Sequence, residues 1–282
     1  MKRILIALLT ASFTLALAQS VDANKYVELY KSLASVPLVT AGNPDLSYEE
    51  AYLFQEAYVQ AFLNSGEELA GYKLGLTGEK RPFGATEAVY GRLFKSQFRE
   101  AGKVYSSDFV KPLVEVELAF NFKKDVDFPL TFGQLKDAID WVAPAIELPD
   151  LVFDDMKNLS WLDLIALDVA PRQVIIGNHV SINDVDVESI NITAYLNGEV
   201  VKQAPSTSTL GGQMRALMFL AAKLNNHMIS FSKINSPLYR IKAGDVVITG
   251  ALGGFIPGKP GQYQVNYGPL GNLDFEIVST GK

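Results

Sequence analysis

The stretch LVEVELAFN, residues 113–121, alternates strictly between two kinds of side chain. Residues two apart on a strand project from the same face, so Glu115 and Glu117 share a face with Leu113 and Ala119. The opposite face is entirely apolar. This pattern predicts a half-buried β-strand whose other face carries a pair of carboxylates.

A third glutamate follows thirty residues later in another apolar segment, VAPAIEL at residues 142–148. Paired acids on an exposed strand need no explanation, but Glu147 in such surroundings does, because a buried carboxylate is costly unless it is paired or binds a metal. If Glu115, Glu117 and Glu147 converged, they would repel one another when ionised. A hard divalent cation would remove that repulsion. From spacing alone, both a metal site and a solvent-facing strand stay open.

Composition excludes several classes of protein. The chain has 282 residues, 48% of them hydrophobic and 20% charged, with a formal net charge of −6, no cysteine and two histidines. Without cysteine there are no disulfides, zinc–thiolate sites, iron–sulfur clusters or thiol nucleophiles. The acidic balance and the lack of a basic run argue against nucleic acid as a partner. Any mechanism must rest mainly on carboxylates, lysines, arginines, hydroxyls and the backbone.

The first eighteen residues, MKRILIALLTASFTLALA, have the pattern of a secretory signal peptide. Lys2 and Arg3 form a positive start, an apolar run follows, and Ala16-Leu17-Ala18 is a small-x-small cleavage site. A membrane anchor is the alternative, but the apolar run is shorter than the roughly 20 residues that a span needs. We therefore expect a periplasmic or secreted protein that has no membrane contact once the signal is removed.

The rest of the chain predicts one α+β domain, residues 19–282, with a helical N-terminal part (19–70) and a β-rich core (71–282). Ser47 and Glu50 are placed as a helix-starting capping box, and Asn197-Gly198 as a hairpin turn. The predicted helices are 21–37, 47–66, 131–141, 157–167 and 212–226. The predicted strands are 71–77, 113–121, 142–148, 172–177, 189–196, 199–203, 245–251 and 273–279.

Several segments, in order, resemble the 2-keto-4-pentenoate hydratase family of the fumarylacetoacetate hydrolase superfamily. They are GYKLGLT (71–77), FGATEAVYG (83–91), PLVEVELAF (112–120), PAIE (144–147) and IKAGDVVITGALG (241–253). Each is weak alone, but the ordered set is specific and covers roughly residues 50–280.

The resemblance implies a fold, a cofactor and a chemistry. The fold would be a fumarylacetoacetate hydrolase-like mixed β-roll with a helical N-terminal part. Glu115, Glu117 and Glu147 would hold Mg²⁺ or Mn²⁺, which would chelate a small 2-oxo or 2-hydroxydienoic acid and stabilise its enolate. Lys73 would lie near this ligand. A lysine in an apolar strand can have a lowered pKa, which suits proton transfer, although a salt-bridged structural lysine is the alternative.

The chain departs from the family's pattern in two segments. Residues 83–91 lack two of the usual acids, and residues 163–172 keep Asp163 and Ala166 but lack the family's central Asp-Asn and Ser-Ser. The metal end therefore looks intact while hydration itself is in doubt. Within the second segment, Asp168 is either an acid/base or a plain loop residue, and Arg172 either binds a ligand carboxylate or lies at the surface.

Other residues narrow the chemistry. Thr249 either hydrogen-bonds the ligand or simply ends a strand. His179 and His227 fall outside the positions where the superfamily's C–C bond hydrolases place their histidine base, so both are expected to be structural. Gly-x-Ser-x-Gly is absent, which disfavours a serine hydrolase.

The leading hypothesis is a metal-dependent lyase, of hydratase or decarboxylase type, that acts on a small 2-oxo or 2-hydroxydienoic acid. The alternative is a non-catalytic exported binding protein for a small carboxylate on the same scaffold, and a third reading is a metal-free structural relative. The family's habit of assembling into oligomers leaves a homo-oligomer open.

Overall fold

The computed structural model describes residues 22–234 and 236–279. The segment interpreted as a signal peptide, residues 1–18, lies outside this part. Among the helices of the described residues, none is both long and apolar enough to cross a membrane.

The N-terminal part is helical. It consists of α2 (Ala23–Lys31), α3 (Val39–Gly42) and α4 (Tyr48–Asn64). The capping box that starts α4 is confirmed, because the Ser47 side chain accepts from the Glu50 backbone while the Glu50 side chain accepts from the Ser47 backbone. The helix predicted over 21–37 is too long, because α2 stops at Lys31 and the chain turns at Leu33, whose φ is +56°.

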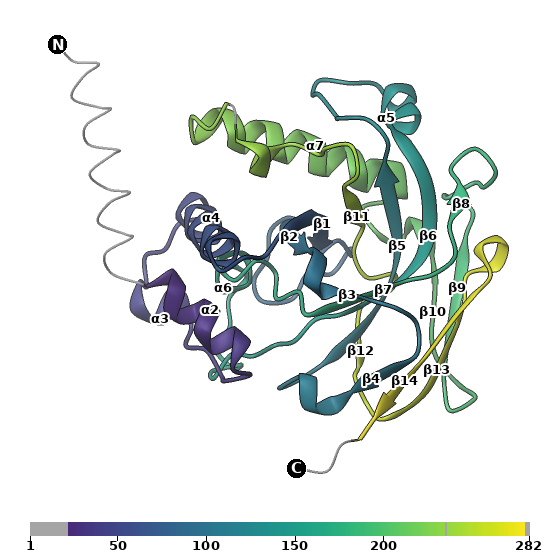
Figure 1. The fold of residues 1–282 in the computed structure, drawn as a ribbon, viewed down its shortest axis with the longest axis horizontal. Coiled ribbons are helices and arrows are strands. Elements are labelled where there is room, and N and C mark those ends of the chain that lie inside the picture. Colours follow the sequence, from purple (N-terminus) through teal and green to yellow (C-terminus); the bar gives the residue numbers. More distant parts are fainter. Residues whose placement is uncertain (1–21, 235, 280–282) are drawn as a thin grey trace.

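The larger sheet has nine strands and lies at the centre of the molecule (Figure 1). Its main order is β2-β1-β11-β5-β6-β7-β3, with β12 added beside β5 and β8 beside β6. The strands are β1 (Leu69–Gly75), β2 (Val89–Phe94), β3 (Phe98–Arg99), β5 (Leu113–Phe122), β6 (Ile139–Leu148), β7 (Gln173–Ile176), β8 (Val180–Ser181), β11 (Val246–Ile248) and β12 (Ile256–Pro257).

A second sheet of five strands, in the order β10-β9-β13-β14-β4, lies beside the first. The strands are β4 (Lys103–Tyr105), β9 (Asn191–Leu196), β10 (Glu199–Pro205), β13 (Gly261–Asn266) and β14 (Asn272–Val278). The hairpin turn predicted between β9 and β10 is confirmed: Asn197 and Gly198 both have positive φ, +52° and +84°.

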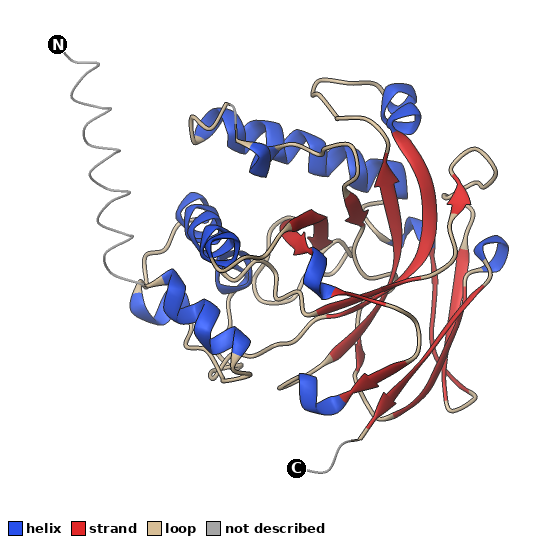
Figure 2. Cartoon of the chain, viewed as in Figure 1, coloured by secondary structure: helices blue, strands red, loops and turns tan. Residues whose placement is uncertain are grey.

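Three further helices complete the fold: α5 (Phe132–Ala138), α6 (Trp161–Ala166) and α7 (Gln213–Ser230). Thr131 caps α5, the helix predicted over 131–141, and the helix is shorter than expected because residues 139–141 already belong to β6. Figure 2 shows the longer helices gathered along one side and the top of the strands. The architecture is the expected mixed α+β roll with a helical N-terminal part.

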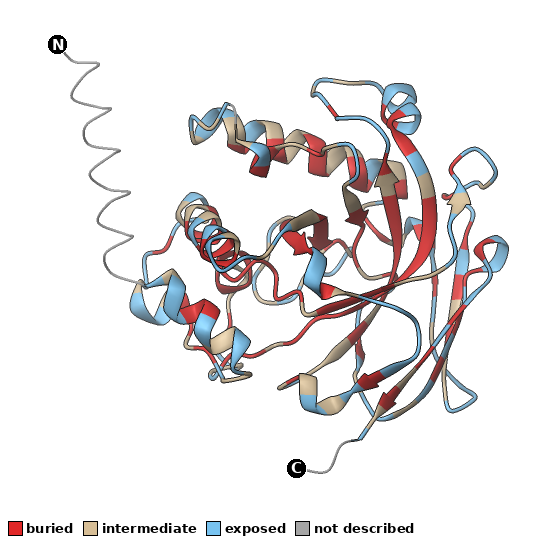
Figure 3. Ribbon diagram, viewed as in Figure 1, coloured by how far each residue is buried: buried red, intermediate tan, exposed pale blue. Residues whose placement is uncertain are grey.

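Strand β5 differs from its prediction in one respect that matters for function. It was expected to be half-buried, yet both faces are largely buried (Figure 3). One face packs in the main hydrophobic core, and on the other Ala119 packs with Leu93, Ala145 and Ile248. Because β5 lies between β11 and β6 in a curled sheet, the face that carries Glu117 is turned inward and away from bulk solvent.

Candidate active site

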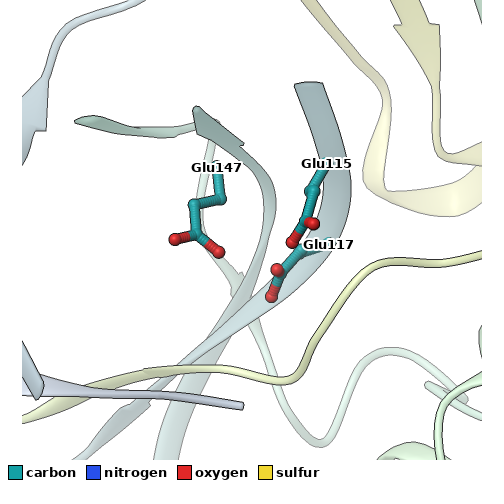
Figure 4. A group of neighbouring side chains, drawn as sticks. All are labelled: Glu115, Glu117 and Glu147. Atoms are coloured by element: carbon teal, nitrogen blue, oxygen red, sulfur yellow. The ribbon is translucent and has the colours of Figure 1, made fainter. Parts of the chain in front are cut away.

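Strand pairing brings the three predicted metal ligands together. Glu115 lies directly opposite Glu147 in the antiparallel register of β5 and β6, and Glu117 lies two residues further along the same face of β5. One carboxylate oxygen from each of the three lies within 4.8 Å of the others. Figure 4 shows the side chains converging from the two strands. We call these three residues the carboxylate cluster.

Each of the two deeper acids has one oxygen bonded and one free. The Glu117 and Glu147 side chains are fully buried. One oxygen of Glu117 accepts from the Gly250 amide and one oxygen of Glu147 accepts from Lys73 Nζ. Within the described residues, Glu117 Oε1 and Glu147 Oε2 have no hydrogen-bond partner. Buried polar atoms without partners are rare, and these two oxygens are available to coordinate a cation.

The electrostatics of the cluster favour a cation. Burial, reinforced by the charge of Glu147, raises the pKa of Glu115 to about 7. Burial and both neighbouring acids also raise the pKa of Glu117, and burial raises that of Glu147 against the opposing charge of Lys73. Three oxygen-donating acids that resist ionisation together fit a hard divalent ion such as Mg²⁺ or Mn²⁺.

Lys73 lies beside the cluster, on β1. Its ammonium group is buried, pairs with Glu147 and donates to the Val169 carbonyl at 3.0 Å. The expectation of a lowered pKa is wrong. Burial alone would lower the pKa of Lys73, but the charges of Glu147, Glu115 and Glu117 outweigh it and raise the pKa. The lysine is therefore a firmly protonated donor in this structure.

An unusual turn supplies the carbonyl that holds Lys73. Asp168, Val169 and Ala170 follow α6 with three successive positive φ values of 57°, 61° and 53°. Left-handed backbone is strained for such residues, and for a β-branched valine above all. The turn lies so close to β1 and β2 that the strand positions facing it, Gly75 and Gly91, have no room for a side chain. A Cβ on Gly91 would fall 2.2 Å from the Asp168 carbonyl oxygen, and one on Gly75 would fall 2.6 Å from Val169.

The same turn buries Asp168. One carboxylate oxygen accepts from the Arg92 backbone amide at 2.8 Å, while Oδ2 has no partner within the described chain. Burial raises the pKa of Asp168 to about 7, although the charge of Arg92 opposes the shift. Charge interactions link this carboxyl to Lys73 and Glu147, so it belongs to the surroundings of the cluster. Its role as an acid/base remains a prediction.

Thr249 lies at the edge of the cluster. Its hydroxyl donates to Gln213 Oε1 at 2.6 Å, and the next residue, Gly250, donates its amide to Glu117 at 2.6 Å. Gly250 has a φ of +95°, and a Cβ there would fall 2.3 Å from Thr77 Oγ1. Sequence reasoning chose Thr249 and missed the Gly250 amide, although the glycine in Thr249-Gly250 was the available signal.

Arg172 is placed differently from the other predicted site residues. Its guanidinium donates to the backbone carbonyls of Asp108 and Tyr30, at 3.0 and 2.8 Å, and lies 4.4 Å from the Tyr30 ring centroid. These partners belong to α2 and to the segment before β5, and none is a member of the carboxylate cluster. The observed contacts therefore hold α2 against the core, and a ligand-binding role for Arg172 remains a prediction.

A cleft of about 1100 Å³ reaches the cluster at Glu115, which is half-buried. Its walls come from three segments, residues 76–82, 207–211 and 251–255. The first of these directly follows β1, which carries Lys73. The cleft gives a small ligand access to the acids while Glu117 and Glu147 stay shielded from water.

The histidines take no part in this site. His179 stacks on Trp141 at 3.7 Å between ring centroids. His227 lies in α7, where its Nδ1 shares a hydrogen bond of 2.7 Å with the Tyr90 hydroxyl. These contacts agree with the structural role expected for both.

Comparisons with known proteins find sequence relatives along most of the chain. No protein-family model matches the chain. It is 26% identical to the 2-keto-4-pentenoate hydratase of Paraburkholderia xenovorans, over 84% of this chain and 86% of the relative. It is also 26% identical to the 2-oxo-hept-4-ene-1,7-dioate hydratase of Escherichia coli (88% and 93% covered) and to the 4-oxalocrotonate decarboxylase of a Pseudomonas species (90% and 92%).

Among solved structures, the fold matches 4-oxalocrotonate decarboxylase from Pseudomonas putida G7, complexed with magnesium and adipate. The TM-score is 0.83 at 24% identity, covering 95% of this chain and 98% of that one. Fumarylpyruvate hydrolase from Pseudomonas aeruginosa, complexed with Mn²⁺ and pyruvate, matches more distantly, with a TM-score of 0.56 at 13% identity over 75% of this chain and 90% of that one. Named sequence relatives along most of the chain and a shared fold support the resemblance of this protein to the 2-keto-4-pentenoate hydratase family of the fumarylacetoacetate hydrolase superfamily.

Proposed function

We propose that this protein is a metal-dependent lyase, of hydratase or decarboxylase type, that acts on a small 2-oxo or 2-hydroxydienoic acid. One observation carries the proposal: three acids converge beside a cleft, and two of them keep a buried oxygen that has no hydrogen-bond partner among residues 22–234 and 236–279. The names of the sequence relatives, hydratases and a decarboxylase, support the reaction class.

Glu115, Glu117 and Glu147 would hold the metal, Mg²⁺ or Mn²⁺. When bound, a divalent cation supplies Lewis-acid chemistry, which polarises the carbonyl of a 2-oxo acid and stabilises negative charge on that substrate. The protein's share is to fix the three acids. The Gly250 amide orients Glu117, and Lys73 orients Glu147, so that one oxygen of each is left for the cation.

Lys73 and Asp168 would handle charge and protons. Lys73, which pairs with Glu147 and donates to the Val169 carbonyl, serves as an ammonium donor toward an anionic substrate oxygen. Asp168, with a pKa raised to about 7, is able to exchange a proton near neutral pH. In our proposal Asp168 is the acid/base of the site, while Thr249 acts through its neighbour Gly250.

The relatives do not support the alternative of a non-catalytic binding protein. Each of those named above is an enzyme. The departures in residues 163–172 bear on the type of reaction, because this segment contains the left-handed turn, whose Val169 carbonyl accepts from Lys73 and whose Asp168 is buried. We therefore keep hydration and decarboxylation as the two forms of the proposal.

The test has two stages. Calorimetry with Mn²⁺ should show binding to the wild type and none to Glu117→Ala, with Lys103→Ala, on exposed β4, as a surface control. Turnover of 2-hydroxypenta-2,4-dienoate, followed by loss of its ultraviolet absorbance, would show hydration. Release of CO₂ from a 2-oxo dicarboxylate would show decarboxylation. Lys73→Ala should lose turnover by about 100-fold or more while it keeps Mn²⁺ binding. A wild type that binds no Mn²⁺, or converts neither acid, would overturn the proposal.

We also propose that residues 1–18 direct export, on the composition of that segment alone. Expression of the full chain in a bacterial host, followed by fractionation and intact mass measurement, tests this. The expected product is a periplasmic or secreted protein that begins at Gln19. A full-length product retained in the cytoplasm would contradict the proposal.

A further inference from the structure

The cleft is lined by three chemically different kinds of side chain. One is Glu115, a member of the carboxylate cluster. Apolar side chains of Leu76, Leu210 and Ala251 line it with the aromatic ring of Phe255, which is 47% exposed. The loop 79–81, Glu79-Lys80-Arg81, lines it as well and carries one more positive than negative charge. The same cleft therefore offers a ligand an acid of the carboxylate cluster, apolar groups and a net positive loop.

Arg81 is held in place and yet is not neutralised. It is half-buried, and its Nε donates to the Leu76 carbonyl at 2.9 Å, which ties the guanidinium to the start of its own loop. In the described part of the chain it forms no ion pair, and its two terminal nitrogens have no hydrogen-bond partner. Several other basic residues do have acids: Lys95 pairs with Glu68, and Lys242 with Asp125.

A guanidinium with two free terminal nitrogens has a specific chemical preference. It presents parallel donors that match the two oxygens of a carboxylate, and it keeps its charge at any physiological pH. Anchoring through Nε reduces the side-chain entropy that such a contact would otherwise cost. Glu79 lies in the same loop, but it is exposed and forms no ion pair with Arg81 within the described residues.

We propose that Arg81 binds the far carboxylate of a 2-oxo dicarboxylic acid whose 2-oxo acid end meets the carboxylate cluster. This inference rests on the proposed function and narrows its substrate class. The apolar side chains that line the cleft accept the carbon chain, and Arg81 distinguishes a terminal carboxylate from a terminal methyl group. A monocarboxylate would leave the guanidinium without a partner inside the cleft.

The test compares two acids of the same chain length, 2-oxoadipate and 2-oxohexanoate, which differ only in having a carboxylate or a methyl group at the far end. Calorimetry on the Mg²⁺-loaded wild type should give about tenfold or more tighter binding of 2-oxoadipate. Arg81→Gln should lose this preference and bind 2-oxohexanoate as the wild type does. Arg99→Gln, an equal charge change at an exposed arginine on β3, should keep the preference.

A second measurement needs no variant. In the wild type, the preference should shrink as NaCl rises from about 50 mM to about 500 mM, because an accessible ion pair is screened. Equal binding of both acids to the wild type, or a preference that survives Arg81→Gln, overturns this inference and leaves the lyase proposal standing. Binding of neither acid to the Mg²⁺-loaded protein overturns both proposals.

Discussion

Two groups of polar side chains in the described part of the protein differ in charge and in whether their buried polar atoms have hydrogen-bond partners. The first is the carboxylate cluster. The second, the tyrosine–histidine cluster, consists of Tyr48, Tyr52, Tyr90 and His227 between α4, β2 and α7. There the Tyr90 hydroxyl bonds His227 Nδ1 at 2.7 Å, the Tyr52 hydroxyl accepts from the Tyr90 amide at 3.2 Å, and the rings of Tyr52 and Tyr90 stack at 4.8 Å.

The tyrosine–histidine cluster is neutral and satisfies itself. Burial, helped by the charge of Lys223, lowers the pKa of His227 to about 3, so its ring carries no charge. The carboxylate cluster holds three acids beside the ammonium group of Lys73, and two of its oxygens lack partners in the described chain. Burial of polar groups alone therefore does not mark a site. Uncompensated charge beside a cleft does.

The largest expected effect tests the charged side of this comparison. Glu117→Gln keeps the shape of the side chain and an acceptor for the Gly250 amide, but removes a metal ligand. Activity should fall by about 1000-fold or more. Mn²⁺ at about 100 times its dissociation constant should raise the free energy of unfolding of the wild type by about 2.7 kcal/mol and leave the variant unchanged. Urea unfolding with and without Mn²⁺ measures this. A variant that Mn²⁺ stabilises equally would show that the ion binds elsewhere.

The next effect concerns the support behind the cluster. Gly91→Ala places a Cβ 2.2 Å from the Asp168 carbonyl oxygen, so the left-handed turn must move away from β2. We expect a loss of about 3 kcal/mol in unfolding free energy. Gly133→Ala in α5, where the nearest atom would be 3.8 Å away, is the matched control and should be neutral or slightly stabilising. Equal stability of the two variants would mean that the turn yields without cost.

Much of the carboxylate cluster could be predicted from the sequence. Alternation in residues 113–121 fixed a strand and put two acids on one face, and an acid in an apolar strand singled out Glu147. Resemblance joined these strands before their pairing was known. Helix caps and the Asn-Gly turn were equally local signals, which is why the start of α4 and the hairpin between β9 and β10 were predicted well.

The rest depends on contacts between segments that are not adjacent in sequence. Strands β2 and β13 were missed: β2 pairs with β1, the strand before it, and β13 pairs with its neighbour β14 and with β9, which lies far back in the chain. Nothing local in Asp168-Val169-Ala170 predicts a left-handed turn, and valine argues against it. The turn exists because Gly75 and Gly91 leave room for it. The pKa of Lys73 was misjudged for the same reason, since its direction depends on three acids from other strands.

A further effect should appear in the pH dependence of the unfolding free energy, because the buried Asp168 near the carboxylate cluster changes its protonation. The pKa of Asp168 is raised from 3.8 to about 7, so between these values the folded protein holds a proton that the unfolded chain releases. Wild-type stability therefore falls as pH rises through this window, and the loss persists above it. Asp168→Asn removes this dependence, so at pH 8 the variant should gain about 4 kcal/mol on the wild type relative to pH 4.

Urea unfolding across this pH range measures the difference, with Asp274→Asn on an exposed position of β14 as the control. A difference between Asp168→Asn and wild type that is flat with pH would show that Asp168 is ionised in the folded protein throughout. It would also remove the basis for treating Asp168 as the proton-exchanging group.

The smallest expected effect tests the tyrosine–histidine cluster. Tyr90→Phe removes the hydroxyl that bonds His227 Nδ1 and leaves a buried ring nitrogen without its partner. Stability should fall by about 1 kcal/mol, the usual cost of one such bond. Activity should stay within about twofold of the wild type, because the tyrosine–histidine cluster is structural. Tyr105→Phe, at an exposed tyrosine, should change neither quantity. If kcat fell by about tenfold or more while the fold held, His227 would belong to the catalytic machinery. The presence of hydrogen-bond partners for buried polar atoms would then not be a valid criterion for separating the two clusters.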